Sequence, residues 1–211
     1  MIILNLGAIV HDDFLHPDRA MRDIDPTLTA EKWLNGLSEF DGPNRLVLLC
    51  IFAVFGIPAS YLDVGSGTGV MVNTARLLGV DGWGLDILPR PQFPHLIQHD
   101  LVLPYLFGRE FDLVTCIETA EHVEPEGADN LVDTIALHTK LGAGRIVFTA
   151  APPGQIGAHH VNCQGAEYWR AKFYERGAGY NETLTWRLCS ALSTLPIPMG
   201  WIAANMQVFI R

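Results

Sequence analysis

The sequence is poor in basic residues and has no clustered cysteines. It holds 14 Lys and Arg against 23 Asp and Glu in 211 residues, so its formal net charge is −9. A protein that neutralises nucleic-acid phosphates usually carries a basic face, so a nucleic-acid partner is disfavoured. No CxxC pair occurs, which argues against a zinc framework or a disulfide scaffold. We expect four reduced, mostly buried thiols and a cytoplasmic location; these are Cys50, Cys116, Cys163 and Cys189.

Long apolar runs are also missing. The longest, Leu46 to Phe55, has ten residues, whereas a membrane-spanning helix needs about 20. We therefore expect no membrane association and interpret the run as a buried helix. The first 14 residues have no basic region and reach an acidic residue at Asp12, unlike a signal peptide. With 49% hydrophobic and 18% charged residues, disorder is excluded and one domain with a real core is expected.

Strands and helices alternate through the central part of the chain. Strands are predicted at 61–64, 82–87, 95–98, 111–117 and 145–150, and helices at 70–78, 126–141, 167–176 and 184–195. Helices at 29–37 and 43–55 are predicted before them, and residues 201–210 are predicted as a late edge strand. This alternation favours an α/β domain with a mostly parallel sheet. We predict an N-terminal helical extension at 1–57 and one domain at 58–211.

A glycine-rich loop, LDVGSGTG at 62–69, lies between a predicted strand and a predicted helix. Gly65 allows a tight turn, Gly67 lets the backbone approach a ligand, and Gly69 allows the helix to pack on the strand. A phosphate-binding P-loop would need GxxxxGK followed by Ser or Thr, and no Lys follows here. The dinucleotide pattern GxGxxG is broken by Val70. The loop therefore matches neither of the two common phosphate-binding patterns.

Two acidic residues indicate the ligand of this loop. Asp63 precedes the first glycine by two residues, where its carboxylate would repel a pyrophosphate and favour a cationic ligand. S-adenosylmethionine carries an α-ammonium and a sulfonium and has no phosphate. Asp86 ends the next predicted strand, 17 residues after Gly69, where a carboxylate can accept both ribose hydroxyls. The loop and both acids, in this order, predict an S-adenosylmethionine site.

On these residues the sequence resembles the class I S-adenosylmethionine-dependent methyltransferase superfamily. The resemblance covers 58–151 and is carried by LDVGSGTG at 62–69, GLD at 84–86, HD at 99–100 and FDLVTCIETAEHV at 111–123. The stretches at 157–169 and 205–211 are similar to small phage or bacterial members. The resemblance implies a Rossmann-like, mostly parallel seven-stranded sheet with helices on both faces and an antiparallel last strand.

The resemblance also implies a set of donor-binding residues. They are Asp63, Gly65, Ser66, Gly67, Gly69, Asp86, Ile87, Asp100, Leu101 and Glu118. In such enzymes Asp63 and Gly65 would lie at the methionine moiety, Asp86 at the ribose and Asp100 at the adenine amino group. The backbone N–H of Leu101 would contact the adenine ring. By analogy, Trp33 in the N-terminal extension would form part of a lid over the donor.

Histidines in two clusters are candidates for catalysis. A hydroxyl acceptor needs a base to take its proton, whereas the enzyme otherwise mainly aligns the reactants. His122 follows the fourth predicted strand, and His159 and His160 follow the fifth. Imidazoles titrate near neutral pH, and we rank His160 first. These histidines with Glu118 and Glu121 could also converge on a metal, but no spacing of the HExxH kind demands one, so no metal is predicted.

Two missing sequence motifs restrict the possible methyl acceptors. Strand 111–117 is not followed by the D/N-P-P-Y/F/W motif of nucleobase amine methyltransferases, and no Pro-Cys nucleophile is present. We therefore predict methylation of a small molecule or sugar, at oxygen and with a His base. Three alternatives stay open: an N-methyltransferase acting on an amine or peptide, a non-catalytic S-adenosylmethionine-binding module, and a nucleotide-cofactor oxidoreductase. The sequence does not indicate an oligomeric state.

Overall fold

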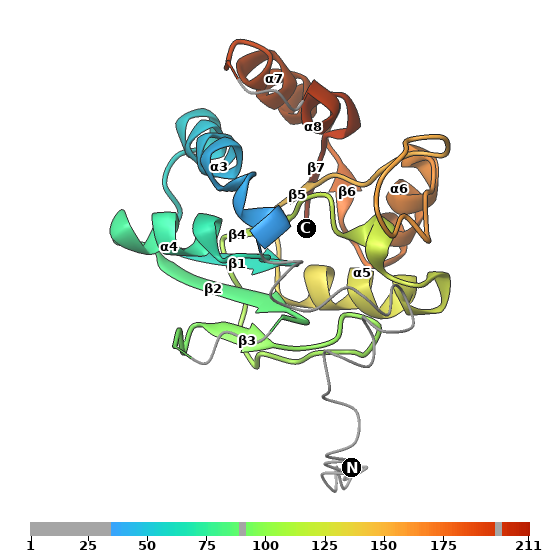
Figure 1. Ribbon diagram of the computed structural model, residues 1–211, viewed down its shortest axis with the longest axis horizontal. Helices are drawn as coiled ribbons and strands as arrows, with labels where there is room; N and C mark the ends of the chain where they lie inside the picture. Colours follow the sequence, from blue (N-terminus) through green and yellow to red (C-terminus); the bar gives the residue numbers. More distant parts are fainter. Residues whose placement is uncertain (1–34, 89–91, 197–199) are drawn as a thin grey trace, which may run out of the picture.

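The computed structural model describes residues 35–88, 92–196 and 200–211 (Figure 1). The strands are β1 (Ser60–Val64), β2 (Asp81–Asp86), β3 (Leu96–Gln98), β4 (Leu113–Cys116), β5 (Arg145–Phe148), β6 (Gly179–Tyr180) and β7 (Gln207–Ile210). The helices are α3 (Asp41–Phe55), α4 (Val70–Leu77), α5 (Ala128–Leu137), α6 (Ala166–Glu175), α7 (Glu182–Leu192) and α8 (Gly200–Asn205). Short 3₁₀ turns lie at Ala120–His122 and Pro125–Gly127. The predicted alternation of strands and helices is thus confirmed.

The strands form one seven-stranded sheet in the order β3-β2-β1-β4-β5-β7-β6. Strands β1 to β5 are parallel to one another, and β7 runs antiparallel to both β5 and β6. The predicted fold class is confirmed, including the antiparallel last strand. Strand order reverses next to β1, so ligands are expected at the carboxyl ends of β1 and β4.

Helices cover both faces of the sheet, which explains the apolar central strands. Every residue of β1 and β4 is buried. One core cluster joins α3, α4, α7 and α8 to the sheet, and a second joins α5 and α6 to the opposite face (Figure 1). Trp169 and Phe173 of α6 are buried in the second cluster, as is Cys116 of β4.

The prediction of one strand at 201–210 is wrong. Residues Gly200–Asn205 form α8, and only Gln207–Ile210 continue as a strand. Strand β7 pairs residue for residue with β5, which has four residues, so a longer strand would lack a partner there. Nor is β7 an edge strand, because β6 pairs with its other side. Strand β6 has two residues, too few to show an alternating pattern in the sequence.

Helix α3 carries the apolar run and is amphipathic. Its residues Val47, Leu48 and Ile51 are fully buried, whereas Leu46 and Leu49 are each 38% exposed. It packs in the same core cluster as α4 and α7. Most of the predicted helix at 29–37, and Trp33, lie outside the described residues, although 35–38 are helical. The boundary between residues 57 and 58 stays a prediction.

The cysteines are reduced, and the described helices are short. All four cysteines are free, with Cys50 and Cys116 buried and Cys163 and Cys189 partly exposed. Among the helices in the described part of the chain, none has the length and apolar character needed to cross a bilayer.

Candidate functional site

The loop between β1 and α4 is held close to β2. The backbone N–H groups of Gly65 and Ser66 both donate to the carbonyl of Leu85, at 2.8 and 2.9 Å. Gly65, Gly67 and Gly69 have φ values of 81°, 53° and 79°. These left-handed conformations are strained for residues with a side chain, so glycine is required three times in five residues.

The loop is tightly packed at Gly65 and Gly69 and less tightly at Gly67. A Cβ at Gly65 would overlap the side chain of Thr119, and one at Gly69 would overlap Leu96. A Cβ at Gly67 would meet a single atom among the described residues, Leu37 Cδ1 at 3.5 Å. Gly67 is therefore the least crowded of the three glycines, and Leu37, before α3, lies next to it.

The side chain of Asp86, at the carboxyl end of β2, approaches Gly67. Its Oδ2 accepts a hydrogen bond from the N–H of Gly67 at 2.7 Å, and its Oδ1 accepts from the N–H of Leu88 at 2.9 Å. Ser66 is buried on the other side of the loop, where a Cβ at Gly84 would lie 2.7 Å from its Oγ. The structure thus places the Asp86 carboxylate directly beside the glycine loop.

Asp63 lies at the end of β1 and is 3% exposed. Its Oδ1 accepts a hydrogen bond of 2.6 Å from Thr115, whose hydroxyl also bonds Tyr61 at 2.7 Å. Burial raises the pKa of Asp63 to about 7, and the charge of Asp86 adds to this effect. A cationic group bound beside Asp63 would stabilise its ionised form.

The remaining predicted donor residues lie at the ends of β2 and β3. The carbonyl of Ile87 accepts a hydrogen bond of 3.2 Å from Gln98. Asp100 Oδ1 accepts from the N–H of Val102 at 3.0 Å. The side chain of Leu101 is buried in the core cluster that includes α5. These residues border the same edge of the sheet as Asp86.

Glu118 follows β4 and has an unusual backbone conformation. Its φ is 48°, one of two positive values among non-glycine residues in the described ranges. Its N–H donates to Thr149 Oγ1 at 2.8 Å, and its Oε2 accepts from Gln155 Nε2 at 3.2 Å. Strained backbone of this kind is common at functional sites.

The structure brings Glu121, His122 and His160 together. One ligand-capable atom of each lies within 4.8 Å of the other two, and the two imidazole rings are edge to face with centroids 5.1 Å apart. Burial lowers the pKa of His122 to about 4, and His160 contributes. His159 is not part of this group; its φ is 59° and its carbonyl bonds His122 Nδ1 at 3.0 Å.

Sequence reasoning missed Gln155, which connects the two clusters. Its side chain donates to Glu118 and accepts from Asn205, and its carbonyl bonds His160 Nδ1 at 3.1 Å. No motif marks a lone glutamine in a loop, so only the spatial arrangement identifies it. Thr149 and Gly157, which contact Glu118 and His160, were missed for the same reason.

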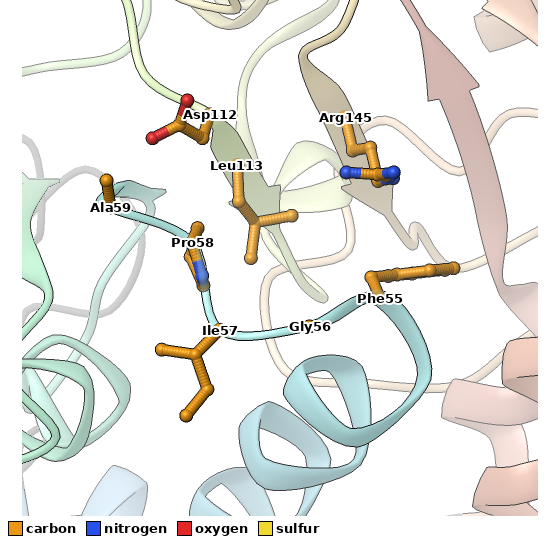
Figure 2. Close-up of a pocket in the computed structure, with 8 residues that line it drawn as sticks. All are labelled: Phe55, Gly56, Ile57, Pro58, Ala59, Asp112, Leu113 and Arg145. Atoms are coloured by element: carbon orange, nitrogen blue, oxygen red, sulfur yellow. The ribbon is translucent and has the colours of Figure 1, made fainter.

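One pocket lies at the amino-terminal ends of the strands, opposite the glycine loop (Figure 2). It has a volume of about 260 Å³ and is lined by residues just before the strands or at their first positions, including Pro58, Asp112 and Arg145. Because it lies at the amino ends of β1, β4 and β5, it is remote from the glycine loop. We do not assign the donor to it.

Comparison with known proteins gives a family and a fold. A family model described as a methyltransferase domain matches residues 38–177. No curated protein matches the sequence. Among solved structures, a TehB-like S-adenosylmethionine-dependent methyltransferase from Corynebacterium glutamicum has a TM-score of 0.61 at 17% identity, covering 86% of this chain and 97% of that one.

Two further structures cover more of the chain. The sugar N-methyltransferase KedS8 from Streptoalloteichus has a TM-score of 0.55 at 15% identity, covering 100% of this chain and 99% of that one. The 1,6-didemethyltoxoflavin-N1-methyltransferase from Burkholderia thailandensis has a TM-score of 0.60 at 13% identity, covering 90% and 86%. The resemblance noted in the sequence is confirmed: this chain belongs to the methyltransferase domain family, and its fold is that of the class I methyltransferases.

Proposed function

We propose that the protein transfers a methyl group from S-adenosylmethionine to a small molecule or a sugar. The observation that carries the proposal is the pairing of a buried Asp63 and the Asp86 carboxylate on either side of the glycine loop. Bound there, S-adenosylmethionine would supply a methyl group activated by its sulfonium. Two carboxylates favour such a cationic nucleoside over a dinucleotide.

The described residues fit this donor. Asp63 would bind the ammonium, because the ionised carboxylate is otherwise unfavourable in its buried position. Asp86 would exchange its bond to Gly67 for the ribose hydroxyls. Asp100 and Leu101, at the end of β3, would bind the adenine. Gly67 is the least crowded of the three loop glycines, so the backbone is most approachable there.

We further propose that the N-terminal extension covers this donor. Asp41 at the start of α3 accepts a hydrogen bond of 2.5 Å from Thr68 in the loop. Leu37 lies over Gly67. Together these contacts tie the start of α3 and the residue Leu37 before it to the loop, as a lid requires.

The acceptor is proposed to react at oxygen. His122 and His160 each bond a backbone carbonyl through Nδ1, which makes Nε2 the nitrogen with a lone pair. Such a nitrogen can accept the proton of a hydroxyl. His159, the third candidate, directly precedes His160 in the chain. The second candidate is N-methylation, because two of the similar structures are named as N-methyltransferases.

Thermal unfolding with S-adenosylhomocysteine, with NAD and with buffer tests the donor. Ligand at about 100 times its dissociation constant adds roughly 2.7 kcal/mol to the free energy of unfolding. We expect a rise in Tm with S-adenosylhomocysteine and none with NAD. Transfer of labelled methyl groups to panels of hydroxyl and amino acceptors, including sugars, tests the reaction. Label on amino acceptors alone would favour the second candidate.

A further inference from the structure

Glu121, His122 and His160 form a compact cluster of metal-ligand types beside the proposed donor site. Glu121 and His122 lie in the 3₁₀ turn after β4, and His160 lies in the loop after β5. Their ligand-capable atoms lie within 4.8 Å of one another. Ligands about 2.1 Å from one ion lie roughly 3–4 Å apart, so small side-chain movements would suffice to bind a metal.

Both imidazoles are oriented as metal-bound histidines usually are. His122 Nδ1 bonds the carbonyl of His159 at 3.0 Å, and His160 Nδ1 bonds the carbonyl of Gln155 at 3.1 Å. A carbonyl only accepts, so each Nδ1 carries the proton and each Nε2 carries a lone pair. Such bonds fix the tautomer and the ring orientation in metal sites.

The carboxylate of Glu121 supplies an independent observation. The residue is 0% exposed. Its carboxylate lies near the backbone N–H groups of Glu121 and Ala151 and near the Glu118 carboxyl, but neither oxygen forms a well-aligned hydrogen bond and no cation among the described residues pairs with it. The Glu118 carboxylate, which has one buried oxygen without a hydrogen-bond partner in the described part of the chain, repels the negative charge of Glu121. Burying carboxylates without a counter-charge is costly, and a cation at this position would remove the cost.

The backbone holds the cluster in place. The N–H groups of Val161 and Asn162 both donate to the carbonyl of Glu121, at 2.9 and 3.0 Å. A Cβ at Gly157 would overlap the ring of His160, so the loop packs directly on that imidazole. The turn after β4 and the loop after β5 are therefore fixed relative to each other.

We propose that Glu121, His122 and His160 bind a divalent transition-metal ion. Two imidazoles and one carboxylate favour Mn²⁺, Fe²⁺, Co²⁺ or Zn²⁺ over Mg²⁺ and Ca²⁺, which prefer oxygen ligands. The Glu118 carboxyl, which neighbours that of Glu121, is placed to orient this ligand. The proposal departs from the sequence-based prediction of no metal, because spacing along the chain could not show that the two loops meet.

A role for the ion rests on the proposed function. Thr119, between Glu118 and the 3₁₀ turn, contacts Gly65, so the cluster borders the donor loop. Three protein ligands leave positions for oxygens of an acceptor, which the ion would orient and make more acidic. In that case His122 and His160 are ligands and not bases, since the same lone pair cannot hold both a metal and a proton.

The test measures metal binding by the full chain. The protein is stripped with a chelator, dialysed against Co²⁺, Mn²⁺, Zn²⁺ or Mg²⁺, and analysed for bound metal and for Co²⁺ visible absorption. His122→Asn and His160→Asn keep a donor at the place of Nδ1 and delete Nε2; Glu121→Gln removes the charge. His95→Gln is the control for the histidine variants, because the glutamine amide can keep the hydrogen bond that His95 Nε2 forms with Asn73. Glu126→Gln, at an exposed position, is the control for Glu121→Gln.

We expect about one transition-metal ion per chain, bound more tightly than Mg²⁺, with absorption typical of histidine-bound Co²⁺. Each of the three ligand variants should weaken binding by more than about 100-fold, beyond the 10- to 100-fold cost of losing an outer hydrogen bond. The controls should bind as the unaltered protein does. No bound metal, or equal binding in the ligand variants, would overturn the proposal.

Stabilisation by S-adenosylhomocysteine is measured on the same samples. It reports that each variant is folded and separates the two proposals. Metal binding without a response to S-adenosylhomocysteine would support the metal site and contradict the proposed donor. A response to S-adenosylhomocysteine without metal binding would overturn the metal site and leave the donor assignment standing.

Discussion

Thr119 packs directly onto Gly65, so that any Cβ at Gly65 would overlap the threonine side chain. The two residues lie after β4 and β1, strands that pair in the centre of the sheet. Through this contact the glycine-rich loop touches the segment that carries Glu118 and the 3₁₀ turn at Ala120–His122. The proposed donor and acceptor sides of the site are thus in contact at one point.

Gly65→Ala is expected to damage the donor site more than the fold. Gly65 has a φ of 81°, and Gly79, at the end of α4, has a φ of 82° with no atom within 4 Å of an added Cβ. Both alanines carry the left-handed penalty of about 1–2 kcal/mol, but only the first also displaces Thr119. We expect S-adenosylhomocysteine affinity to fall more than about tenfold in Gly65→Ala, a loss of roughly 1.4 kcal/mol.

Gly79→Ala is the control for this prediction, because it should lower Tm without changing affinity. Calorimetric titration and thermal unfolding of both variants give the two quantities. Equal affinities in the two variants would contradict the importance of the contact.

Asp86→Asn tests the ribose assignment. The asparagine retains a carbonyl oxygen for Gly67 but loses the charge and one acceptor for the ribose hydroxyls. We expect donor affinity to fall roughly 10- to 100-fold, in the range of about 1.5–3 kcal/mol for hydrogen bonds to charged groups. A nucleoside analogue without ribose hydroxyls should show little difference between the variant and the unaltered protein.

Asp81→Asn is the matched control at the other end of β2. Asp81 forms a surface ion pair with Arg109 at 2.7 Å, and both side chains are more than a third exposed. Such a pair contributes little to stability, and Asp81 lies far along the strand from the loop. If Asp81→Asn weakened binding as much as Asp86→Asn, the ribose assignment would be wrong.

The buried Asp63 should make the ligand-free protein less stable as pH rises. Its pKa is about 7 in the folded chain against an ordinary value of 3.8, so between these values the unfolded chain releases a proton that the folded chain retains. The free energy of unfolding therefore falls from about pH 4 to about pH 7, by up to roughly 4 kcal/mol, and then levels off. Urea unfolding across this range should show a smaller fall in Asp63→Asn, whose amide oxygen can still accept from Thr115.

Asp63 should also make donor binding depend on pH. A ligand ammonium favours the ionised carboxylate, so below about pH 7 binding must release a proton. We expect S-adenosylhomocysteine affinity to fall as pH drops below 7, by at most about tenfold per unit. The affinity of Asp63→Asn for S-adenosylhomocysteine should be lower than that of the unaltered protein and nearly independent of pH over this interval. A similar slope in both proteins would assign the dependence to another group.

The geometry of the proposed donor side could be predicted because its signals are local in the sequence. The three loop glycines, Asp63 and Asp86 are close in the chain, and each follows from the demands of a strand-loop-helix unit on the backbone. Strand and helix positions were predicted for the same reason, since regular burial produces regular patterns. The short β6 and α8 were missed because two and six residues carry little pattern.

The acceptor side could be predicted only as a set of candidates. Glu121 and His160 are far apart in the chain, and nothing in either segment shows that Glu121 is fully buried or that His160 meets His122. His159 and His160 are adjacent, yet only His160 joins the cluster, because the backbone turns at His159 with a φ of 59°. Local conformation of this kind depends on tertiary contacts, here with the carbonyl of Glu121.

Gly157→Ala is expected to weaken metal binding although it replaces none of the three proposed ligands. The added methyl group would overlap the ring of His160 and displace it from the cluster. Gly165→Ala is a fair comparison, because Gly165 has an ordinary φ of −68° and no atom within 4 Å of an added Cβ. We expect Co²⁺ affinity to fall roughly 10- to 100-fold in Gly157→Ala, as when outer contacts of a metal ligand are lost. Visible absorption titrations check this, and a Gly157→Ala curve that coincides with that of Gly165→Ala would mean that the position of His160 is irrelevant to metal binding.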